Sequence, residues 1–351
     1  MSDANLFAQQ EQNRRRSFWL VTGFVLFFAW IGFGGDLAWY LATAEAPAGA
    51  YRHVVPWMGL GACAVAGGIA WYAWRTGPRK VLLATGAWEL ITPHTPEQER
   101  LVNVVEEMAI ASGLPRPRIW IVPDQDANAF ATGHDEQTAH VAVTEGLLTL
   151  LDRDELQGVV AHEMAHIRNY DVRLMTLLAA LVGAIALMSD VGRKFLRGGG
   201  RVGRAGRGAL GRGGGGRGGK GGGGAAIVVV VLVLWLVSLA IAPIVSRLLA
   251  MAVSRKREFL ADATAAQFTR NPMGLATALE KIEAAGTPTH RITSGAAHLC
   301  IVDPLGRRLN NRTGFLADRF ATHPPMAMRL SRLRGMAYQA DKADRADTLT
   351  G

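Results

Sequence analysis

The stretch VVAHEMAHIRN, residues 159–169, carries the strongest structural signal in this chain. Acidic residues precede it, where they favour the positive end of a helix dipole, so we expect a helix over residues 154–169. Residues four apart lie on one helix face, which brings the imidazoles of His162 and His166 together. Glu163 follows the first of these directly. The pattern therefore predicts a helix that presents two metal ligands.

Two imidazoles leave a metal site incomplete, because a tetrahedral catalytic zinc takes three protein ligands and one water. Glu163, beside the first imidazole, is placed to take a proton from that water. Downstream, Glu258 and Asp262 are also four apart, so one could bind metal while the other orients an imidazole. Their alternative role is ion pairing with neighbouring arginines on a solvated helix. The residues alone also leave open, as third ligand, His290, His298 and His323.

Short strands and further helices are expected around this helix. The stretches RIWIVPD (118–124) and HVAVTEG (140–146) have the pattern of strands and are separated by NAFATG. Helical periodicity predicts further helices at residues 97–112, 255–268, 273–285 and 326–336. The polar tail from residue 339 is expected to fray. These elements predict a mostly α fold with a small β-sheet.

Four apolar stretches are candidates for membrane helices: residues 17–35, 54–74, 174–189 and 225–245. Crossing a hydrocarbon core of roughly 30 Å takes about 20 apolar residues, so 174–189 is marginal and the others are long enough. Buried helices of a large soluble protein are the alternative for the first pair. Basic clusters flank the outer ends of that pair, so the N-terminus and everything from residue 75 onward are expected in the cytoplasm.

The positive charge of the chain lies almost wholly in one segment. The net charge is +9, but residues 190–224 hold nine basic residues, one acidic residue and 18 glycines. The rest of the chain holds 29 basic and 28 acidic residues, which disfavours a nucleic-acid-binding domain. We interpret the insert as a flexible linker, or as a segment attracted to anionic lipid headgroups. If both flanking stretches cross the membrane the insert is outside; if they form a re-entrant hairpin it stays in the cytoplasm.

Four separate stretches resemble those of one family: NAFATG (128–133), ELQGVVAHEMAHIRNYD (155–171), SRKREFLADA (254–263) and THPPMAMRL (322–330). Together they resemble the HtpX-like membrane zinc endopeptidases, in the superfamily that includes the CAAX prenyl proteases. The resemblance spans roughly residues 17–333. It implies a gluzincin-type metalloprotease domain with a small β-sheet, plus about four transmembrane or membrane-embedded helices.

The resemblance also implies roles for individual residues around one Zn²⁺ per subunit. Glu258 is the expected third zinc ligand, and Asp262 is expected to orient a ligand imidazole. His323 is expected to stabilise an oxyanion, its alternative being a helix-start residue fixed by the two prolines that follow. An edge strand is expected to bind extended substrate through Asn128, Ala129 and Phe130. The side chain of Asn128 could instead satisfy a turn.

The implied function is a membrane-embedded zinc endopeptidase that degrades misfolded or membrane proteins in quality control. Its partners would be polypeptide substrates and the lipid bilayer, and the sequence sets no oligomeric state. The expected location is the bacterial inner membrane, as a multi-pass protein with the catalytic domain facing the cytoplasm. The alternatives are a dedicated processing protease of CAAX type, a non-catalytic zinc-binding scaffold or chaperone, and an RNA- or lipid-binding protein that acts through the insert.

The expected organisation along the chain has six parts. A cytoplasmic N-terminal tail, a transmembrane hairpin and the first half of the metalloprotease domain occupy residues 1–16, 17–74 and 75–173. An apolar helix pair with the insert, the second half of the domain and a flexible tail follow at residues 174–253, 254–338 and 339–351.

Overall fold

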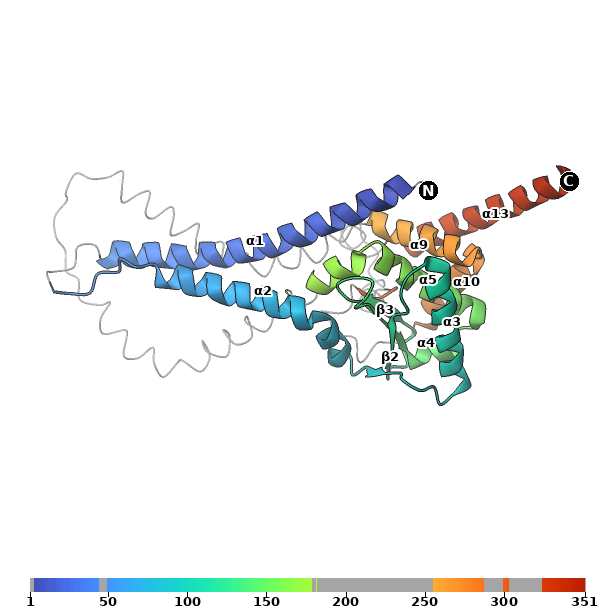
Figure 1. Ribbon diagram of the computed structural model, residues 1–351, viewed down its shortest axis with the longest axis horizontal. Coiled ribbons are helices and arrows are strands. Elements are labelled where there is room, and N and C mark those ends of the chain that lie inside the picture. Colours follow the sequence, from blue (N-terminus) through green and yellow to red (C-terminus); the bar gives the residue numbers. More distant parts are fainter. Residues whose placement is uncertain are drawn as a thin grey trace. The chain divides into compact units, whose positions relative to one another are not determined.

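The computed structural model describes residues 3–43, 49–178, 181, 255–286, 299–302 and 324–350. The chain divides into two compact units, and Figure 1 labels most of the helices and strands of the described residues. One contains Met1–Leu20, Tyr72–Ala180 and Leu249–Gly351, and the other contains Val21–Trp71 and Leu181–Leu248. The Arg/Gly insert, most of the third apolar stretch and all of the fourth lie outside the described residues, as do His290, His298 and His323.

The first unit contains a small mixed sheet of four strands: β1 (Trp88–Glu89), β2 (Arg118–Val122), β3 (Ala129–Thr132) and β4 (His140–Thr144). Their order is β1-β2-β4-β3, with β2 and β4 parallel and the other two pairings antiparallel. The strands expected at 118–124 and 140–146 are confirmed, each slightly shorter than expected. The NAFATG stretch forms β3, which is an edge strand of this sheet.

Alternate residues of the strands face two different apolar layers, as the period of two in a strand requires. On one face, residues such as Ile121, Ala131 and Val143 join a core with the helices that carry the metal-ligand pattern. On the other face, Trp120 and Phe130 pack with residues of the helical segments 81–84 and 171–178. The sheet is thus covered on both sides: β3 is buried throughout, and β2 and β4 are buried beyond their first residues, Arg118 and His140.

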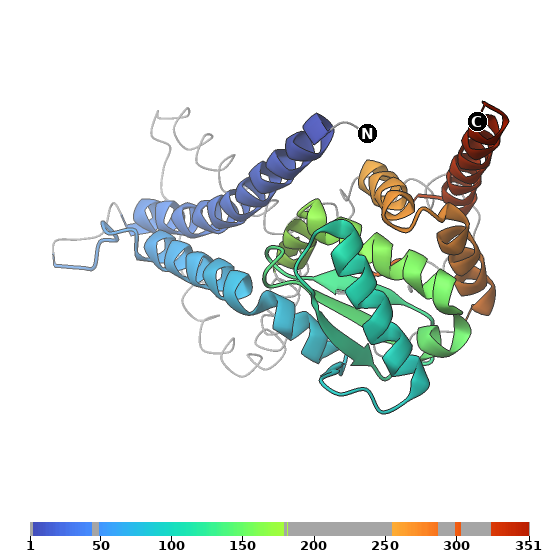
Figure 2. The ribbon, with the colours of Figure 1, turned by 45° about the vertical axis from the view of Figure 1, so that its right-hand side comes forward.

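The helices that accompany this sheet in the first unit include α3 (Pro96–Ser112), α4 (Glu145–Leu150), α5 (Arg153–Arg168), α9 (Arg255–Thr269), α10 (Pro272–Ala285) and α13 (Met326–Thr350). Figure 2 shows α3 and α5 side by side over one face of the sheet. The expected helices are present, whereas β1 and α4 were not anticipated. α13 runs to Thr350 instead of ending near residue 336, and its polar end contains four residues of the strong helix former Ala.

Local chemistry fixes where α5 begins and how closely it packs. Asp152 accepts a hydrogen bond from the Glu155 amide, and the Glu155 side chain accepts one from the Asp152 amide, which forms a capping box. Further along, a Cβ atom on Gly158 would lie 2.6 Å from the Leu275 nitrogen, and one on Gly274 would lie 2.7 Å from the Asp154 oxygen. The backbones of α5 and α10 therefore approach at distances that only glycine allows.

Two long helices, α1 (Asp3–Thr43) and α2 (Trp57–Ala84), extend into the second unit, which includes residues 21–43 of α1 and 57–71 of α2. They pack through glycine, because a Cβ on Gly32 would lie 2.6 Å from the Met58 oxygen. Residues 3–16, expected as a tail, form the first turns of α1, and α2 continues ten residues beyond the expected end at residue 74. Among the described residues, one helix segment, Glu11–Leu41, is long and apolar enough to cross a membrane.

Candidate metal centre

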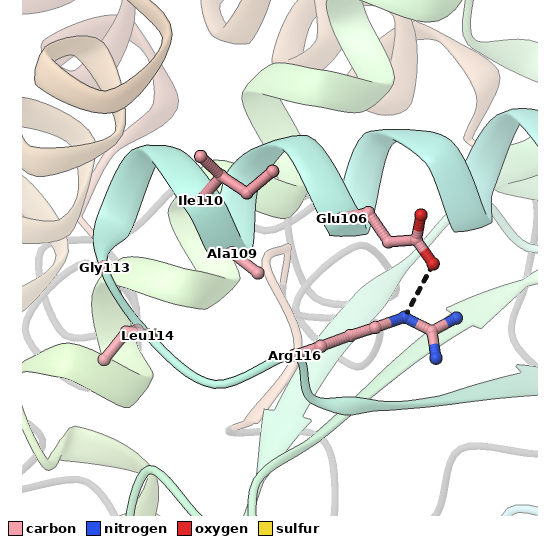
Figure 3. A pocket seen from close by; sticks show the side chains of 6 residues that line it. All are labelled: Glu106, Ala109, Ile110, Gly113, Leu114 and Arg116. Atoms are coloured by element: carbon pink, nitrogen blue, oxygen red, sulfur yellow. Dashed lines mark ion pairs between the residues drawn. The ribbon is translucent and has the colours of Figure 1, made fainter.

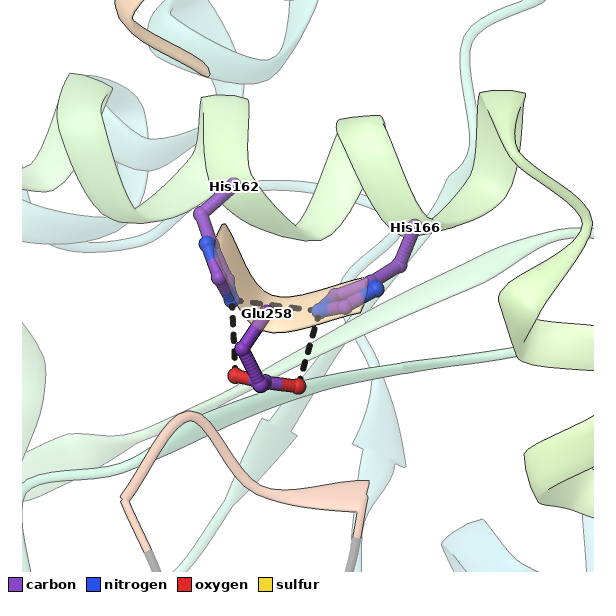
Figure 4. A group of neighbouring side chains, drawn as sticks. All are labelled: His162, His166 and Glu258. Atoms are coloured by element: carbon purple, nitrogen blue, oxygen red, sulfur yellow. Dashed lines mark hydrogen bonds and ion pairs between the residues drawn. The ribbon is translucent and has the colours of Figure 1, made fainter. Parts of the chain in front are cut away.

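His162 and His166 project from one face of α5 towards Glu258 on α9 (Figure 4). The two Nε2 atoms are 3.1 Å apart, and the Glu258 carboxylate lies 3.8 Å from one and 3.6 Å from the other. One donor atom from each residue lies within 4.8 Å of the other two, which suits a single cation. α5 and α9 pack against each other, so the three donors come from two supported helices.

The Nδ1 side of each imidazole, opposite the side that faces Glu258, faces a carboxylate. His162 Nδ1 lies 3.0 Å from Asp262 Oδ1, and His166 Nδ1 lies 3.1 Å from Asp171 Oδ2. The Nδ1 atom of each ring thus faces a carboxylate, so Nε2 is the atom that each imidazole, once neutral, can offer to a cation beside Glu258. This donor set of two neutral imidazole nitrogens and one carboxylate fits a borderline metal ion such as zinc.

The carboxylate behind His162 is itself bound by a buried arginine. Arg329, on α13, donates from Nε and Nη2 to the two oxygens of Asp262 and from Nη1 to the Ile301 carbonyl. Its Nη1 also lies 3.7 Å from Glu258. Burial alone would raise the pKa of Asp262, but the Arg329 charge outweighs it and the pKa is lowered to about 2. His162 consequently faces a permanent negative charge.

The carboxylate behind His166 lies just beyond the end of α5. Tyr170 has a φ of 56°, a left-handed conformation that is costly for an aromatic residue, and it turns the chain back so that Asp171 meets His166. In the metal-free protein, burial alone would lower the pKa of His166, but the bond to Asp171 and the Glu258 charge raise it to about 9. A cation at this site would therefore displace a proton.

Glu163 lies beside the three donors and is almost fully buried. Neither of its carboxylate oxygens has a hydrogen-bond partner of standard geometry among the described residues. Burial raises the pKa of Glu163 to about 7, so the group can both accept and release a proton near neutral pH. A cavity of about 20 Å³, room for about one water molecule, is lined by Glu163, His166, Glu258 and Leu299 among others.

The outer edge of β3 is partly covered by residues 299–302. Phe130 and Cys300 form an isolated antiparallel bridge, and the Ile301 amide donates to the Ala129 carbonyl at 3.0 Å. Asn128 donates from Nδ2 to the Val302 carbonyl at 3.0 Å, and its Oδ1 accepts from the Ala129 amide. The chain's own segment therefore pairs with the first half of β3, while Ala131 lines the cavity.

The structure brings together five residues that the sequence singled out: His162, Glu163, His166, Glu258 and Asp262. The predicted substrate-binding residues Asn128, Ala129 and Phe130 lie at the start of the edge strand. Sequence reasoning missed the contributions of Asp171 and Arg329. Both lie within the stretches that resemble the family, but their spacing indicates no partner.

A second pocket lies at the end of α3. It is larger than the cavity beside Glu163, but its lining includes no group of metal-ligating side chains. It encloses about 530 Å³ and is lined by apolar residues and one ion pair, between Arg116 and Glu106 at 3.2 Å (Figure 3). It shares no lining residue with the metal centre. The concentration of buried donors around His162 therefore marks the functional site better than the volume of a surface hollow does.

Comparisons with known proteins agree with this geometry. Residues 95–337 match the model of peptidase family M48. A "Protease HtpX homolog" of Dictyoglomus thermophilum is 40% identical over 272 residues, which cover 76% of this chain and 78% of the relative. One of Streptococcus uberis is 33% identical over 334 residues, which cover 94% and 100%.

Among solved structures, the crystal structure of S. mikatae Ste24p aligns with 94% of this chain and 66% of that one. The TM-score is 0.41 and the sequence identity is 14%. The family model covers both ligand-bearing helices, and the relatives match over most of their own length. The chain belongs to peptidase family M48 and is a metalloprotease of the HtpX-like group.

Proposed function

We propose that the protein is a membrane-anchored, zinc-dependent endopeptidase that cleaves unfolded or misfolded polypeptides, membrane proteins among them. The observation that carries the proposal is the convergence of His162, His166 and Glu258 within 4.8 Å, with the buried Glu163 carboxylate beside them. A purely structural metal site needs no such base. In a chaperone or scaffold that bound metal only for structure, Glu163 would have no proton to transfer.

The residues divide the chemistry between them. Zinc held by His162, His166 and Glu258 would polarise a peptide carbonyl and acidify a bound water. Glu163 accepts the proton of the attacking water on a carboxylate oxygen and delivers it to the nitrogen of the leaving amine. We place His323 as the donor to the developing oxyanion, as the family resemblance implies.

Substrate binding is proposed along β3. An extended peptide that adds to a sheet edge is held by main-chain hydrogen bonds, which tolerate many side chains and suit unfolded substrates. Asn128, Ala129 and Phe130 would form the start of that surface. Since residues 299–302 pair with this part of β3, we expect substrate either to displace them or to pair further along, at Ala131 and Thr132.

Anchoring in a membrane is supported by the Glu11–Leu41 segment of α1. Apolar side chains that a soluble helix would bury are exposed along it, among them Phe18, Trp19, Leu26 and Trp30. We propose a multi-pass protein of the bacterial inner membrane whose peptidase unit faces the cytoplasm. Reactivity of a cysteine introduced at position 208, in intact cells, tests on which side the insert lies.

The proposal is tested with the full chain purified in detergent and an unfolded protein as substrate. Cleavage should stop when a chelator removes the metal and return when zinc is added. The same substrate in its folded state should be cleaved far more slowly, and a short prenylated peptide should not be preferred. Absence of chelator-sensitive cleavage would overturn the proposal, and preference for the prenylated peptide would favour a dedicated processing protease.

A further inference from the structure

We propose that Asn13, on the first helix of the chain, is a positioning residue of the metal centre that acts through Asp171 on His166. Asn13 Nδ2 donates to Asp171 Oδ1 at 2.8 Å and to the Asn169 carbonyl at 2.9 Å. All three residues are buried, and Asn13 lies in the same compact unit as the metal centre. The inference rests on the proposed function in so far as His166 binds a cation.

The orientation of the Asn13 amide follows from its partners. A carboxylate oxygen and a main-chain carbonyl both accept hydrogen bonds, so only the amide nitrogen can face them. One side chain thus ties the carboxylate of Asp171 to the backbone of the turn that carries it. An aspartate at position 13 would have the same size but would oppose Asp171 with a second negative charge.

The hydrogen bond from Asn13 fixes the orientation of the Asp171 carboxylate towards His166. The carboxylate has two oxygens: Oδ2 faces His166 Nδ1 at 3.1 Å, and Oδ1 receives the hydrogen bond from Asn13. Arg257 Nη1 approaches the same Oδ1 only at 3.7 Å, beyond hydrogen-bond distance. Asn13 therefore makes the closer, directional contact that keeps the carboxylate from rotating away. A fixed carboxylate keeps the His166 Nε2 lone pair directed at Glu258.

The first helix is seated against the Asn169–Asp171 turn by more than one contact. The Arg14 guanidinium lies over the Tyr170 ring at 5.0 Å from its centre, which supports the residue in the left-handed conformation. Ser17 is buried one helical turn further on, where its hydroxyl donates to the Asn13 carbonyl. The helix that contains the candidate membrane span thus also completes the support of a metal ligand.

The experiment measures zinc affinity and not cleavage. The full chain in detergent is freed of metal and titrated with Zn²⁺ against a chromophoric competing chelator. We expect Asn13→Ala to weaken affinity about 10-fold, within the range of about 10- to 100-fold for residues that orient a metal ligand. Asn13→Asp, which keeps the volume, should weaken it more. Ser17→Ala, on the same helix and equally buried, should stay within about twofold of the unaltered chain.

A double variant tests whether Asn13 acts through Asp171. If it does, Asn13→Ala adds little to the loss caused by Asp171→Ala, whereas independent effects would multiply. Multiplying effects, or an Asn13→Ala affinity within twofold of the unaltered chain, overturn the inference. So does a lower melting temperature of the metal-free Asn13→Ala protein without loss of affinity, because Asn13 would then only anchor the helix. If the unaltered chain binds no zinc, the proposed function itself fails.

Discussion

Arg329 binds both carboxylate oxygens of Asp262, with Nε 2.9 Å from Oδ2 and Nη2 2.6 Å from Oδ1. The two residues come from helices α13 and α9, and each is almost fully buried. Asp262 also faces His162 Nδ1, so the arginine supports a proposed metal ligand through one intermediary. Such a bidentate pair fixes the carboxylate in direction as well as in charge.

Replacing Arg329 with Met should destabilise the fold and weaken the metal centre together. The substitution leaves the charge of Asp262 buried without its partner, which costs about 3 to 5 kcal/mol in other buried pairs. Denaturant unfolding of the metal-free protein measures this loss. The control is Arg334→Met on the same helix, which breaks an exposed pair with Glu280 and should cost less than about 1 kcal/mol. Equal losses in the two variants would contradict the role assigned to Arg329.

Glu163→Gln should abolish cleavage without loss of metal. The amide keeps the shape of the side chain but cannot accept the proton of the attacking water, so we expect activity to fall at least about 100-fold. Metal content, measured on the same purified sample, should be unchanged. Asp154→Asn removes an exposed carboxylate from the first turn of the same helix and serves as the control. Activity retained by the Glu163→Gln variant would refute the proposed mechanism.

Metal binding should depend on pH because His166 is protonated in the metal-free protein. Its pKa is raised to about 9, so at any lower pH a cation must displace that proton. Apparent zinc affinity should therefore rise about tenfold per pH unit until the pH approaches that value. Titration calorimetry in buffers of different protonation enthalpy counts the protons released. Asp171→Asn removes the carboxylate that raises the pKa and should reduce the release; constant affinity from pH 7 to 9 would speak against the assignment.

The contact between α5 and α10 can be tested at Gly158. A Cβ there would lie 2.6 Å from the Leu275 nitrogen, so Gly158→Ala must push the two backbones apart, at about 1 to 3 kcal/mol. Gly335→Ala is the matched control, because a Cβ at Gly335 meets nothing within 4 Å and should stabilise α13 by up to about 1 kcal/mol. Thermal unfolding compares the two. A neutral or stabilising Gly158→Ala would show that the helices can separate freely.

Deleting residues 198–224 should leave proteolysis of an unfolded substrate unchanged. These residues hold most of the excess positive charge and none of the three proposed metal ligands, His162, His166 and Glu258. Cleavage rate per bound zinc is the measurement, with the full chain as reference. Loss of activity on this deletion, with zinc still bound, would favour a protein that acts through the insert.

The parts of the site that could be predicted from the sequence lie within single helices. His162 and His166 are one turn apart on α5, and Glu258 and Asp262 are one turn apart on α9, so periodicity places each pair on one face. The choice of Glu258 and not Asp262 as the metal-binding carboxylate could be predicted only from the family resemblance. Within the sheet, the residue pattern predicted strands at β2 and β4 but not that the two pair in parallel.

The parts that could not be predicted depend on contacts between distant segments. Arg329 and Asp262 are 67 residues apart in the sequence, and Asn13 and Asp171 are 158 residues apart. No local pattern encodes such pairings, because they depend on how α1 and α13 pack once the domain has formed. The left-handed conformation of Tyr170 was equally hidden, since an aromatic residue gives no sequence sign of a positive φ.

The glycine contact between α5 and α10 has a consequence for how this enzyme can evolve or be recombined. Neither Gly158 nor Gly274 can acquire a side chain unless the facing backbone retreats, and that retreat would carry the metal-binding helix with it. Each of the two glycines is therefore matched to the backbone of the other helix. A chimera that paired α5 with an α10 carrying a side chain at position 274 would keep His162 and His166 and still shift them, so swaps between homologous enzymes are safest when residues 153–285 are exchanged as one block.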